Sequence, residues 1–166
     1  IARALVARPA ALGLPALPQC KLRRGVVIDA VYWLVVNEKL VRLDVFAEFD
    51  LGKGQKGLCE IDTGFFGIMV HSRYMDALGV VPNTPGVDRI EFNPGFFTWK
   101  THLPQIALAA APQHTLENPL VNFGDIIYDC VVGMRFWHDR TLTLDIPARQ
   151  LIVGRRVETD VHPGTR

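Results

Sequence analysis

One short segment of the sequence has the residue types that acid–base chemistry needs. Asp62-Thr63-Gly64 follows a short apolar stretch, residues 58–61, and precedes a second apolar run, residues 65–70. This order predicts a strand that enters a tight turn with the Asp62 carboxylate inside it. Backbone groups of Thr63 and Gly64 can hold one carboxylate oxygen, which leaves the outer oxygen to hold a water molecule. The segment therefore suggests activation of water by a carboxylate.

A second signal lies about 70 residues further along the chain. Val131-Val132-Gly133 ends an apolar segment, and a short helix is expected to start near Met134. The two signals, in this order, resemble the retropepsin-like aspartic proteases, which are single-domain relatives of pepsin. In that family, a strand ending in two apolar residues and a glycine crosses beneath the Asp-Thr-Gly turn. The resemblance covers roughly residues 40–155.

The resemblance implies both a fold and an activity. The fold is all-β, a small closed retropepsin-like barrel with one main short helix, here preceded by an N-terminal extended arm. The activity is that of an aspartic endopeptidase, in which two carboxylates share one proton. One carboxylate acts as base on the water, while the other, protonated, polarises the scissile carbonyl. No metal and no organic cofactor is implied.

The second carboxylate is expected to come from a second chain. The sequence contains one Asp-Thr-Gly, with Asp62 as its acid. Aspartates further along the chain lack the Thr/Ser-Gly that would place them in an equivalent turn: Asp88, Asp125, Asp129, Asp139, Asp145 and Asp160. We therefore expect a homodimer in which Asp62 of each chain supplies one member of the dyad, with a peptide as substrate.

Further site residues follow from the same resemblance. Thr63 and Gly64 would set the turn, and Val131, Val132 and Gly133 would support it from beneath. The family also has a glycine-tipped hairpin, the flap, which closes over the substrate. The flap candidates in this chain are Asn93, Pro94, Gly95, Phe96 and Phe97. The cleft is expected to prefer extended, apolar peptides and to work at mildly acidic pH, where each dyad keeps one proton.

Three departures from the family pattern support a second hypothesis. Phe65 stands where the family has Ala or Ser, the expected flap tip is bulky, and Arg135 replaces the Asp or Asn of many relatives. These features fit a non-catalytic, retropepsin-like structural or interaction subunit of a larger complex. The aromatic cluster in the hairpin suits both hypotheses, as a substrate-gripping flap or as a docking surface. Its members are Phe92, Phe96, Phe97 and Trp99.

Composition excludes several other classes of protein. The chain has 166 residues, of which 49% are hydrophobic, so one domain with a sizeable core is expected. Its net charge of +1 comes from scattered basic residues, which gives no footprint for nucleic acid. No apolar run approaches the roughly 20 residues of a transmembrane segment. The five histidines lie near no second His or Cys at ligand spacing, so no metal site is expected.

The number and spacing of the cysteines exclude a disulfide framework. Cys20, Cys59 and Cys130 are few and far apart in the sequence. Cys59 is interpreted as a small buried hydrophobic residue. A pair made by Cys130 and His138 can be imagined, but spacing alone does not support it.

The elements that must position the Asp62 turn are mostly strands. Residues 26–36 are rich in β-branched and aromatic residues, and residues 43–50 alternate with a period of two. A helix is expected over residues 71–79, with Ser72 as its cap and Gly79 at its end. Residues 141–145 and 150–154 predict a closing hairpin.

The chain is expected to have three parts. Residues 1–25 form a Pro/Ala-rich N-terminal arm, residues 26–155 the retropepsin-like domain, and residues 156–166 a polar C-terminal tail. The arm is either a remnant of a secretion signal or anchor, or an extended strap, and its prolines favour the strap. A periplasmic or membrane-associated location is the corresponding hypothesis for the compartment.

Overall fold

The computed structural model describes residues 26–27, 30–36 and 39–155, and describes side chains from residue 43 to residue 154. The expected arm, residues 1–25, and tail, residues 156–166, lie outside these ranges, and the three-part division of the chain stays a prediction. The strands are β1 Val26–Val27, β2 Ala30–Val36, β3 Lys39–Gly52, β4 Gln55–Ile61, β5 Ile68–His71, β6 Asp88–Asn93, β7 Phe96–His102, β8 Gln105–Leu108, β9 Thr115–Glu117, β10 Leu120–Gly124, β11 Cys130–Val132, β12 Arg140–Asp145 and β13 Gln150–Arg155. The helices are the 3-10 helix η2 Ser72–Tyr74, α1 Met75–Leu78 and α2 Met134–Trp137.

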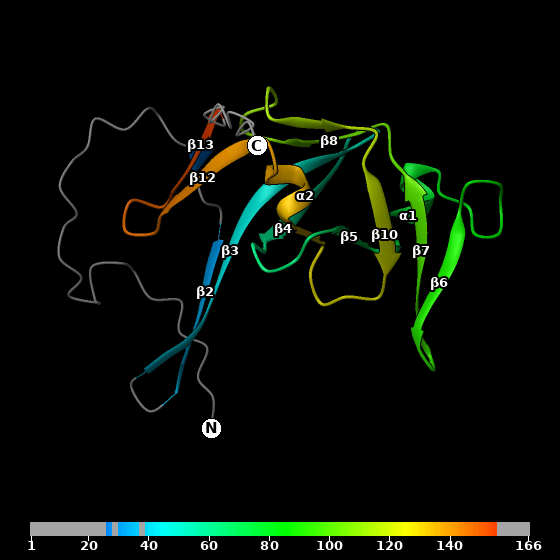
Figure 1. Ribbon diagram of the computed structural model, residues 1–166, viewed down its shortest axis with the longest axis horizontal. Helices are drawn as coiled ribbons and strands as arrows, with labels where there is room; N and C mark the ends of the chain where they lie inside the picture. The colour runs from blue at the N-terminus through cyan, green and yellow to red at the C-terminus, as the bar shows by residue number, and fades with distance from the viewer. Residues whose placement is uncertain (1–25, 28–29, 37–38, 156–166) are drawn as a thin grey trace, which may run out of the picture.

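The strands form one large sheet and one small sheet. Hydrogen-bonded neighbours in the large sheet follow the order β6-β7-β10-β5-β11-β4-β3-β8-β9, and β2 pairs with β3. The small sheet has the order β1-β13-β12, so the expected closing hairpin joins a strand from the start of the described chain. Figure 1 shows the small sheet at one end of the molecule and the β6–β7 hairpin at the other. The all-β expectation is confirmed.

Four short strands at the centre of the large sheet position the Asp62 turn. β4 and β11 run parallel, with Cys59 opposite Cys130 and Ile61 opposite Val132. β5 runs antiparallel to β11, so Ile68 is opposite Val132. β10 in turn runs parallel to β5. The ends of β4 and β11 therefore lie side by side, and the chain leaves β4 through Asp62 at that end.

The core consists of side chains from elements that are distant from one another in the chain. Its largest fully buried members are Phe49 of β3, Phe123 of β10, and Phe136 and Trp137 of α2. Phe49 contacts both α2 rings edge-on, with ring centroids 5.2 Å from Phe136 and 6.1 Å from Trp137. This helix therefore holds the chain just beyond Gly133 against the body of the sheet.

The helix expected over residues 71–79 is present, but its start differs from the expectation. Gly79 ends α1 in the left-handed conformation, at φ 71° and ψ 29°, as expected for a helix-ending glycine. Ser72 does not cap the start. His71 is the N-cap of η2, and its Nδ1 accepts a hydrogen bond from Arg73 N at 3.1 Å. The Ser72 hydroxyl donates instead to Asp125, beyond the end of β10.

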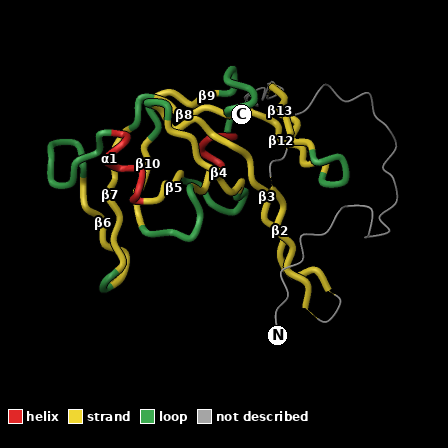
Figure 2. Tube along the Cα trace, turned by 180° about the vertical axis from the view of Figure 1, so that it is seen from behind, coloured by secondary structure: helices red, strands yellow, loops and turns green. Residues whose placement is uncertain are grey.

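Two hairpins project from the body on the same side. In Figures 1 and 2, the β2–β3 hairpin and the β6–β7 hairpin extend in one direction from opposite ends of the molecule. Pro94 and Gly95 form the tip of the β6–β7 hairpin, with Asn93 opposite Phe96. Gly95 has a φ of +86°, the value that favours glycine in a turn after proline. No helix in the described part of the chain is long and apolar enough to cross a membrane.

The structure overturns the expectation about the cysteines. Cys59 and Cys130 form a disulfide between β4 and β11, with their Cα atoms 4.4 Å apart. Both residues are fully buried. Cys59 is therefore buried, as expected, but it is not a free thiol, and Cys130 is not available to pair with His138.

We expect this disulfide to contribute strongly to stability. The two cysteines are 71 positions apart, and closing a loop of that length stabilises the folded state by about 4 kcal/mol in the chain-entropy description. The double variant Cys59→Ala/Cys130→Ala should lose about 2–5 kcal/mol of unfolding free energy in urea titrations. Dithiothreitol should destabilise the unmodified protein and leave the double variant unaffected. Two free thiols in alkylated, unreduced protein would refute the bridge.

A histidine in the β8–β9 connection should make the fold sensitive to acid. Burial, helped by the charge of Arg140, lowers the pKa of His114 from its ordinary 6.5. Because the unfolded chain then binds a proton more readily than the folded one, stability is complete above about pH 6.5 and falls on acidification below it. His114→Gln should flatten this decline between pH 7 and 5 in thermal unfolding. An unchanged slope in His114→Gln would contradict the assignment.

Candidate functional site

The Asp62 turn holds its carboxylate by backbone hydrogen bonds. Oδ1 of Asp62 accepts from Gly64 N at 2.8 Å and from Phe65 N at 3.2 Å. The Phe65 amide also lies 3.4 Å from the Asp62 carbonyl oxygen, which closes the turn. No described residue donates a hydrogen bond to Oδ2. Asp62 is half-buried, and Thr63 and Gly64 are exposed. The turn thus fixes Oδ1, and because the carboxylate is planar this also sets the direction of Oδ2.

The end of β11 is hydrogen-bonded to this turn from both sides. Asp62 N donates to Val132 O at 3.2 Å, at the end of β4. Gly133 N donates to Gly67 O at 2.9 Å, and Met134 N donates to Phe65 O at 2.7 Å. The sequence motifs Asp62-Thr63-Gly64 and Val131-Val132-Gly133 are therefore brought together, as the resemblance implied.

Gly133 is a glycine because the two segments leave no room for a side chain. A Cβ atom at this position would overlap the carbonyl oxygen of Phe65 and would lie 2.6 Å from the carbonyl oxygen of Gly67. Both obstacles are backbone atoms, which cannot rotate away. The close crossing of β11 and the turn therefore depends on this residue.

Phe65 does not stand freely beside the carboxylate. A Cβ on Gly67 would lie 2.9 Å from Phe65 Cζ and 3.3 Å from Cε1, so the ring lies directly over the Gly67 backbone. Phe65 is half-buried in this position. The bulky residue after the Asp-Thr-Gly turn is therefore accommodated by a second glycine two residues later. Sequence analysis noted Phe65 as a departure and missed that Gly67 compensates for it.

Two exposed apolar side chains, Phe66 and Met134, lie in the segments that meet at the turn, and a third, Ile127, lies elsewhere in the chain. Phe66 is 69% exposed, and Ile127, in the β10–β11 connection, is 85% exposed. Met134, which follows the crossing glycine, is 37% exposed. Phe66 O accepts a hydrogen bond from Arg135 N at 2.8 Å, which ties Phe66 to the start of α2. Their exposure was not predictable from the sequence, because each lies in or beside an apolar run.

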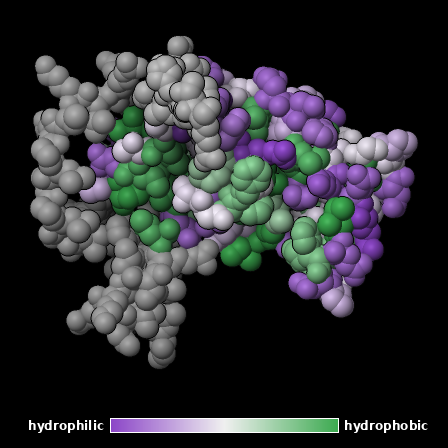
Figure 3. All heavy atoms as spheres, viewed as in Figure 1, coloured by the Kyte–Doolittle hydropathy of each residue, from purple (hydrophilic) through white to green (hydrophobic). Residues whose placement is uncertain are grey.

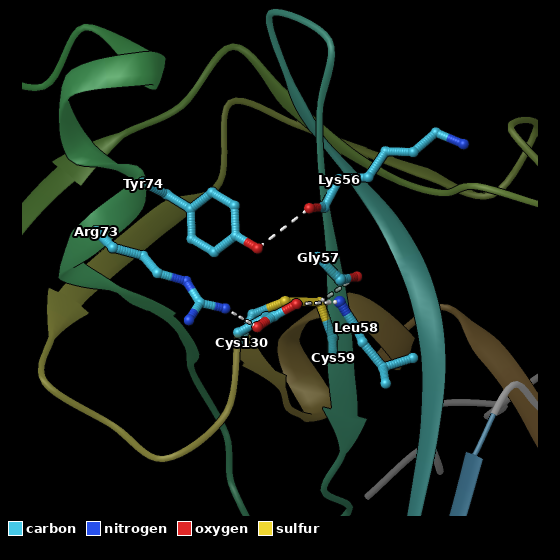
Figure 4. Close-up of a disulfide and its surroundings, with 8 residues drawn as sticks. Lys56, Gly57, Leu58, Cys59, Arg73, Tyr74 and Cys130 are labelled. Atoms are coloured by element: carbon cyan, nitrogen blue, oxygen red, sulfur yellow. Dashed lines mark hydrogen bonds and ion pairs between the residues drawn. A yellow bond between two sulfur atoms is a disulfide. The ribbon is translucent and has the colours of Figure 1, made fainter.

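Asp129 has a structural role that sequence analysis did not anticipate. Its Oδ2 accepts from Leu58 N at 2.9 Å, next to the disulfide, and its backbone oxygen accepts from His71 N at 2.8 Å. Its other carboxylate oxygen forms an ion pair with Arg73. Figure 4 shows Arg73 and Tyr74 on one side of the disulfide, where Tyr74 Oη donates to Lys56 O at 3.2 Å. Asp129, which directly precedes β11, thus links that strand to Leu58 of β4 and His71 of β5, at the end of β11 away from Asp62.

The flap candidates lie at a pocket rather than at the Asp62 turn. A cavity of about 300 Å³ is lined by Gly95, Phe96 and Phe97, together with residues of β7, the end of β10 and Ser72. Asp62, Thr63 and Gly64 are not among the lining residues. Asn93 and Pro94, at the hairpin tip, are exposed. Their assignment to a flap therefore stays a prediction.

The described part of the chain holds no group of three or more His, Cys, Asp or Glu side chains arranged to bind a metal ion. His138 Nδ1 lies 2.9 Å from Arg135 O, at the end of α2.

Comparison with solved structures identifies the fold. The chain is similar to a retropepsin-like aspartic protease from Rickettsia conorii, with a TM-score of 0.52 and 14% sequence identity, over 68% of this chain and 82% of that one. A further match is the retroviral protease-like domain of Ddi1 from Leishmania major, with a TM-score of 0.41 and 13% identity, over 70% of this chain and 92% of that one. No family model and no curated protein matches the sequence.

The chain has a retropepsin-like fold. The sequence identity is low, so this similarity establishes the fold alone. The hypothesis that the strands form a small acid-protease barrel is thereby supported at the level of fold class. Function has to be argued from the residues of the site.

Replacing the crossing glycine tests the geometry of the site. Gly133→Ala should lower the free energy of unfolding by about 3 kcal/mol, because its Cβ meets two backbone carbonyl groups. Gly54→Asn is the matched control. Gly54 has nothing within 4 Å of a Cβ and a φ of +73°, which asparagine tolerates. Urea unfolding measures both changes. A Gly133→Ala variant as stable as the parent would show that the Phe65 and Gly67 carbonyl groups leave room for a side chain at position 133.

Proposed function

We propose that the protein is an aspartic endopeptidase that works as a homodimer. The observation that carries this proposal is the Asp62 turn: its Oδ1 is fixed by Gly64 N and Phe65 N, and its backbone is tied to Val132 and Gly133. A carboxylate fixed in this way on a retropepsin-like fold is suited to bind and activate a water molecule. One chain supplies one such turn, so the reaction needs a second copy.

The proposed reaction follows from the shared proton of two carboxylates. When two such groups lie about 3 Å apart, both cannot ionise comfortably, so one keeps its proton at mildly acidic pH. The ionised Asp62 takes a proton from water, which attacks the scissile carbonyl carbon. The protonated Asp62 of the second chain polarises the carbonyl oxygen. The first Asp62 then passes the proton that it took from water to the amide nitrogen, the C–N bond breaks, and the amine leaves.

The surface around the turn supports association with a second copy. Phe66 is a strongly exposed apolar side chain, and Met134, whose backbone N donates to Phe65 O, is partly exposed. Burying such side chains stabilises an interface by about 1.5–3 kcal/mol each when burial is complete. Bringing the two Asp62 turns together would place Phe66, four residues after Asp62, near the same contact.

The β6–β7 hairpin is the proposed flap. Its tip, Pro94-Gly95, is exposed, as are most residues of β6 and the first two residues of β7. Phe92 and Phe96 contact each other across the hairpin, with ring centroids 5.9 Å apart. In the proposed enzyme these rings would cover an apolar, extended peptide and exclude water from it.

One observation favours a second candidate function. The exposed aromatic side chains of the hairpin, Phe92, Phe96 and Phe97, are 54%, 40% and 37% exposed. Together with Phe66 and Ile127, they would equally suit docking in a non-catalytic subunit of a larger assembly. In that case Asp62 would serve the turn alone, and the chain would associate with unlike subunits.

Replacing Asp62 separates the two functions. The purified protein should cleave peptides from an unbiased library between about pH 4 and 6, and Asp62→Asn should lower kcat at least 1,000-fold, because the amide cannot act as a base. Rates are measured by mass spectrometry of the library with time. Asp76→Asn, at an exposed position in α1 outside the turn, is the matched control and should keep kcat.

The oligomeric state should change with the apolar side chains and not with Asp62. Sedimentation should show a dimer for the parent and for Asp62→Asn, and a monomer for Phe66→Asp. Absence of cleavage at every pH, in protein shown to be folded and dimeric, would contradict the enzyme proposal and leave the docking subunit as the better account.

A further inference from the structure

The pocket beside the β6–β7 hairpin combines aromatic walls with a carboxylate. Phe96, Phe97 and Trp99 come from β7, Phe123 comes from β10, and Asp125 and Ser72 supply the polar side chains. The volume, about 300 Å³, is at the lower end of the range for small-ligand sites. Figure 3 shows the end of the molecule that carries the β6–β7 hairpin as largely polar, with smaller apolar groups on it.

The register of the sheet separates this pocket from the Asp62 turn. Ile61, Val132 and Ile68 lie in one row across β4, β11 and β5, at the end where Asp62 emerges. On β10, Gly124 is opposite His71, three residues beyond Ile68. The pocket therefore lies about 10 Å further along the strands than the turn. The residues that line the pocket are not those that hold the Asp62 carboxylate.

Asp125 is the carboxylate of the pocket. It is exposed, and its Oδ1 accepts a hydrogen bond from the Ser72 hydroxyl. Among the residues that the structure describes, no Lys, Arg or His forms an ion pair with it. Asp129, four residues later, is paired with Arg73, so the nearest basic side chain along η2 is already engaged.

The aromatic wall already accepts a guanidinium group. The Arg89 guanidinium carbon lies 4.2 Å from the centroid of the Phe97 ring, a distance typical of a cation–π contact. Arg89 is also 3.4 Å from Glu91, which offsets its charge. Phe97 in turn meets Trp99 edge-on, with centroids 5.9 Å apart. One face of the Phe97 ring is therefore already stacked with a guanidinium, an arrangement in which an aromatic ring of this hairpin stabilises an organic cation.

We propose that this pocket binds an organic cation, an alkylammonium or guanidinium group, with Asp125 as the counter-charge and Phe96, Phe97 and Trp99 as the aromatic walls. Ser72 fixes the rotamer of Asp125 by donating to Oδ1, which leaves Oδ2 to accept from the cation. Gly124 permits the close approach of β10 to β7, because a Cβ there would lie 2.9 Å from Thr98 Cγ2. The site does not depend on proteolysis, and a lysine or arginine side chain of a peptide and a free amine share the chemistry that it recognises.

Calorimetric titration of the full chain at low ionic strength tests this site. The probes are a blocked pentapeptide, acetyl-Ala-Ala-Lys-Ala-Ala-amide, its arginine and norleucine counterparts, and n-butylammonium chloride. Binding is measured in the Asp62→Asn variant, so that cleavage cannot remove the probe. The lysine and arginine peptides should bind at least tenfold more tightly than the norleucine peptide. If the lysine and arginine peptides bind more tightly than butylammonium, the natural ligand of the pocket is a peptide side chain. If they bind equally tightly, the natural ligand is a free amine.

Two variants locate the binding. Asp125→Asn should reduce the affinity for the lysine peptide at least tenfold, to that of the norleucine peptide, and Phe96→Leu should reduce it about threefold or more. Asp88→Asn, an exposed carboxylate in β6 outside the pocket, is the matched control and should bind like the parent. Equal affinity for lysine and norleucine peptides, no binding of any cation at 10 mM, or an unchanged Asp125→Asn variant would each overturn the proposal. Because binding alone is measured, failure of the proteolysis proposal would leave this result interpretable.

Discussion

The contact of the β11 end with the Asp62 turn is the constraint on which the rest of the site depends. Gly133 lies so close to the carbonyl groups of Phe65 and Gly67 that no side chain fits. Hydrogen bonds from Gly133 N and Met134 N hold the same two carbonyl groups. The backbone after Asp62 is therefore fixed from outside its own turn, and the orientation of the carboxylate is set by a segment about 70 residues away.

Several independent interactions keep β4 and β11 in the register that this contact requires. The Cys59–Cys130 disulfide joins the strands at one row, and Asp129 adds hydrogen bonds to β4 and β5. At the other end of β11, α2 buries Phe136 and Trp137 against Phe49. A slip by one residue would break all of these together, because the side-chain period of a strand is two. The site is thus positioned by covalent, polar and apolar contacts at successive points along one strand.

Much of the fold was predictable because its signals are local. Alternating residues indicated β3, the apolar runs on either side of Asp62 indicated β4 and β5, and Gly79 ends α1 as a left-handed residue should. The prediction that Ser72 caps the helix was wrong. His71 and Ser72 are both able to cap, and Asp125, which is distant in sequence, accepts a hydrogen bond from the Ser72 hydroxyl. The disulfide was missed because wide spacing in sequence says nothing about opposition in a parallel pair of strands.

The sequence by itself determined the acidic turn, the glycine that crosses it, and the single occurrence of Asp-Thr-Gly, because these depend on residue identity and nearest neighbours. Only the tertiary structure decided that the Phe65 ring lies over Gly67, that Cys59 meets Cys130, and that aromatic rings and Asp125 share a pocket. These arrangements depend on the register between strands that are distant in the chain. Register is set by the packing of the whole core, which no short stretch of sequence specifies.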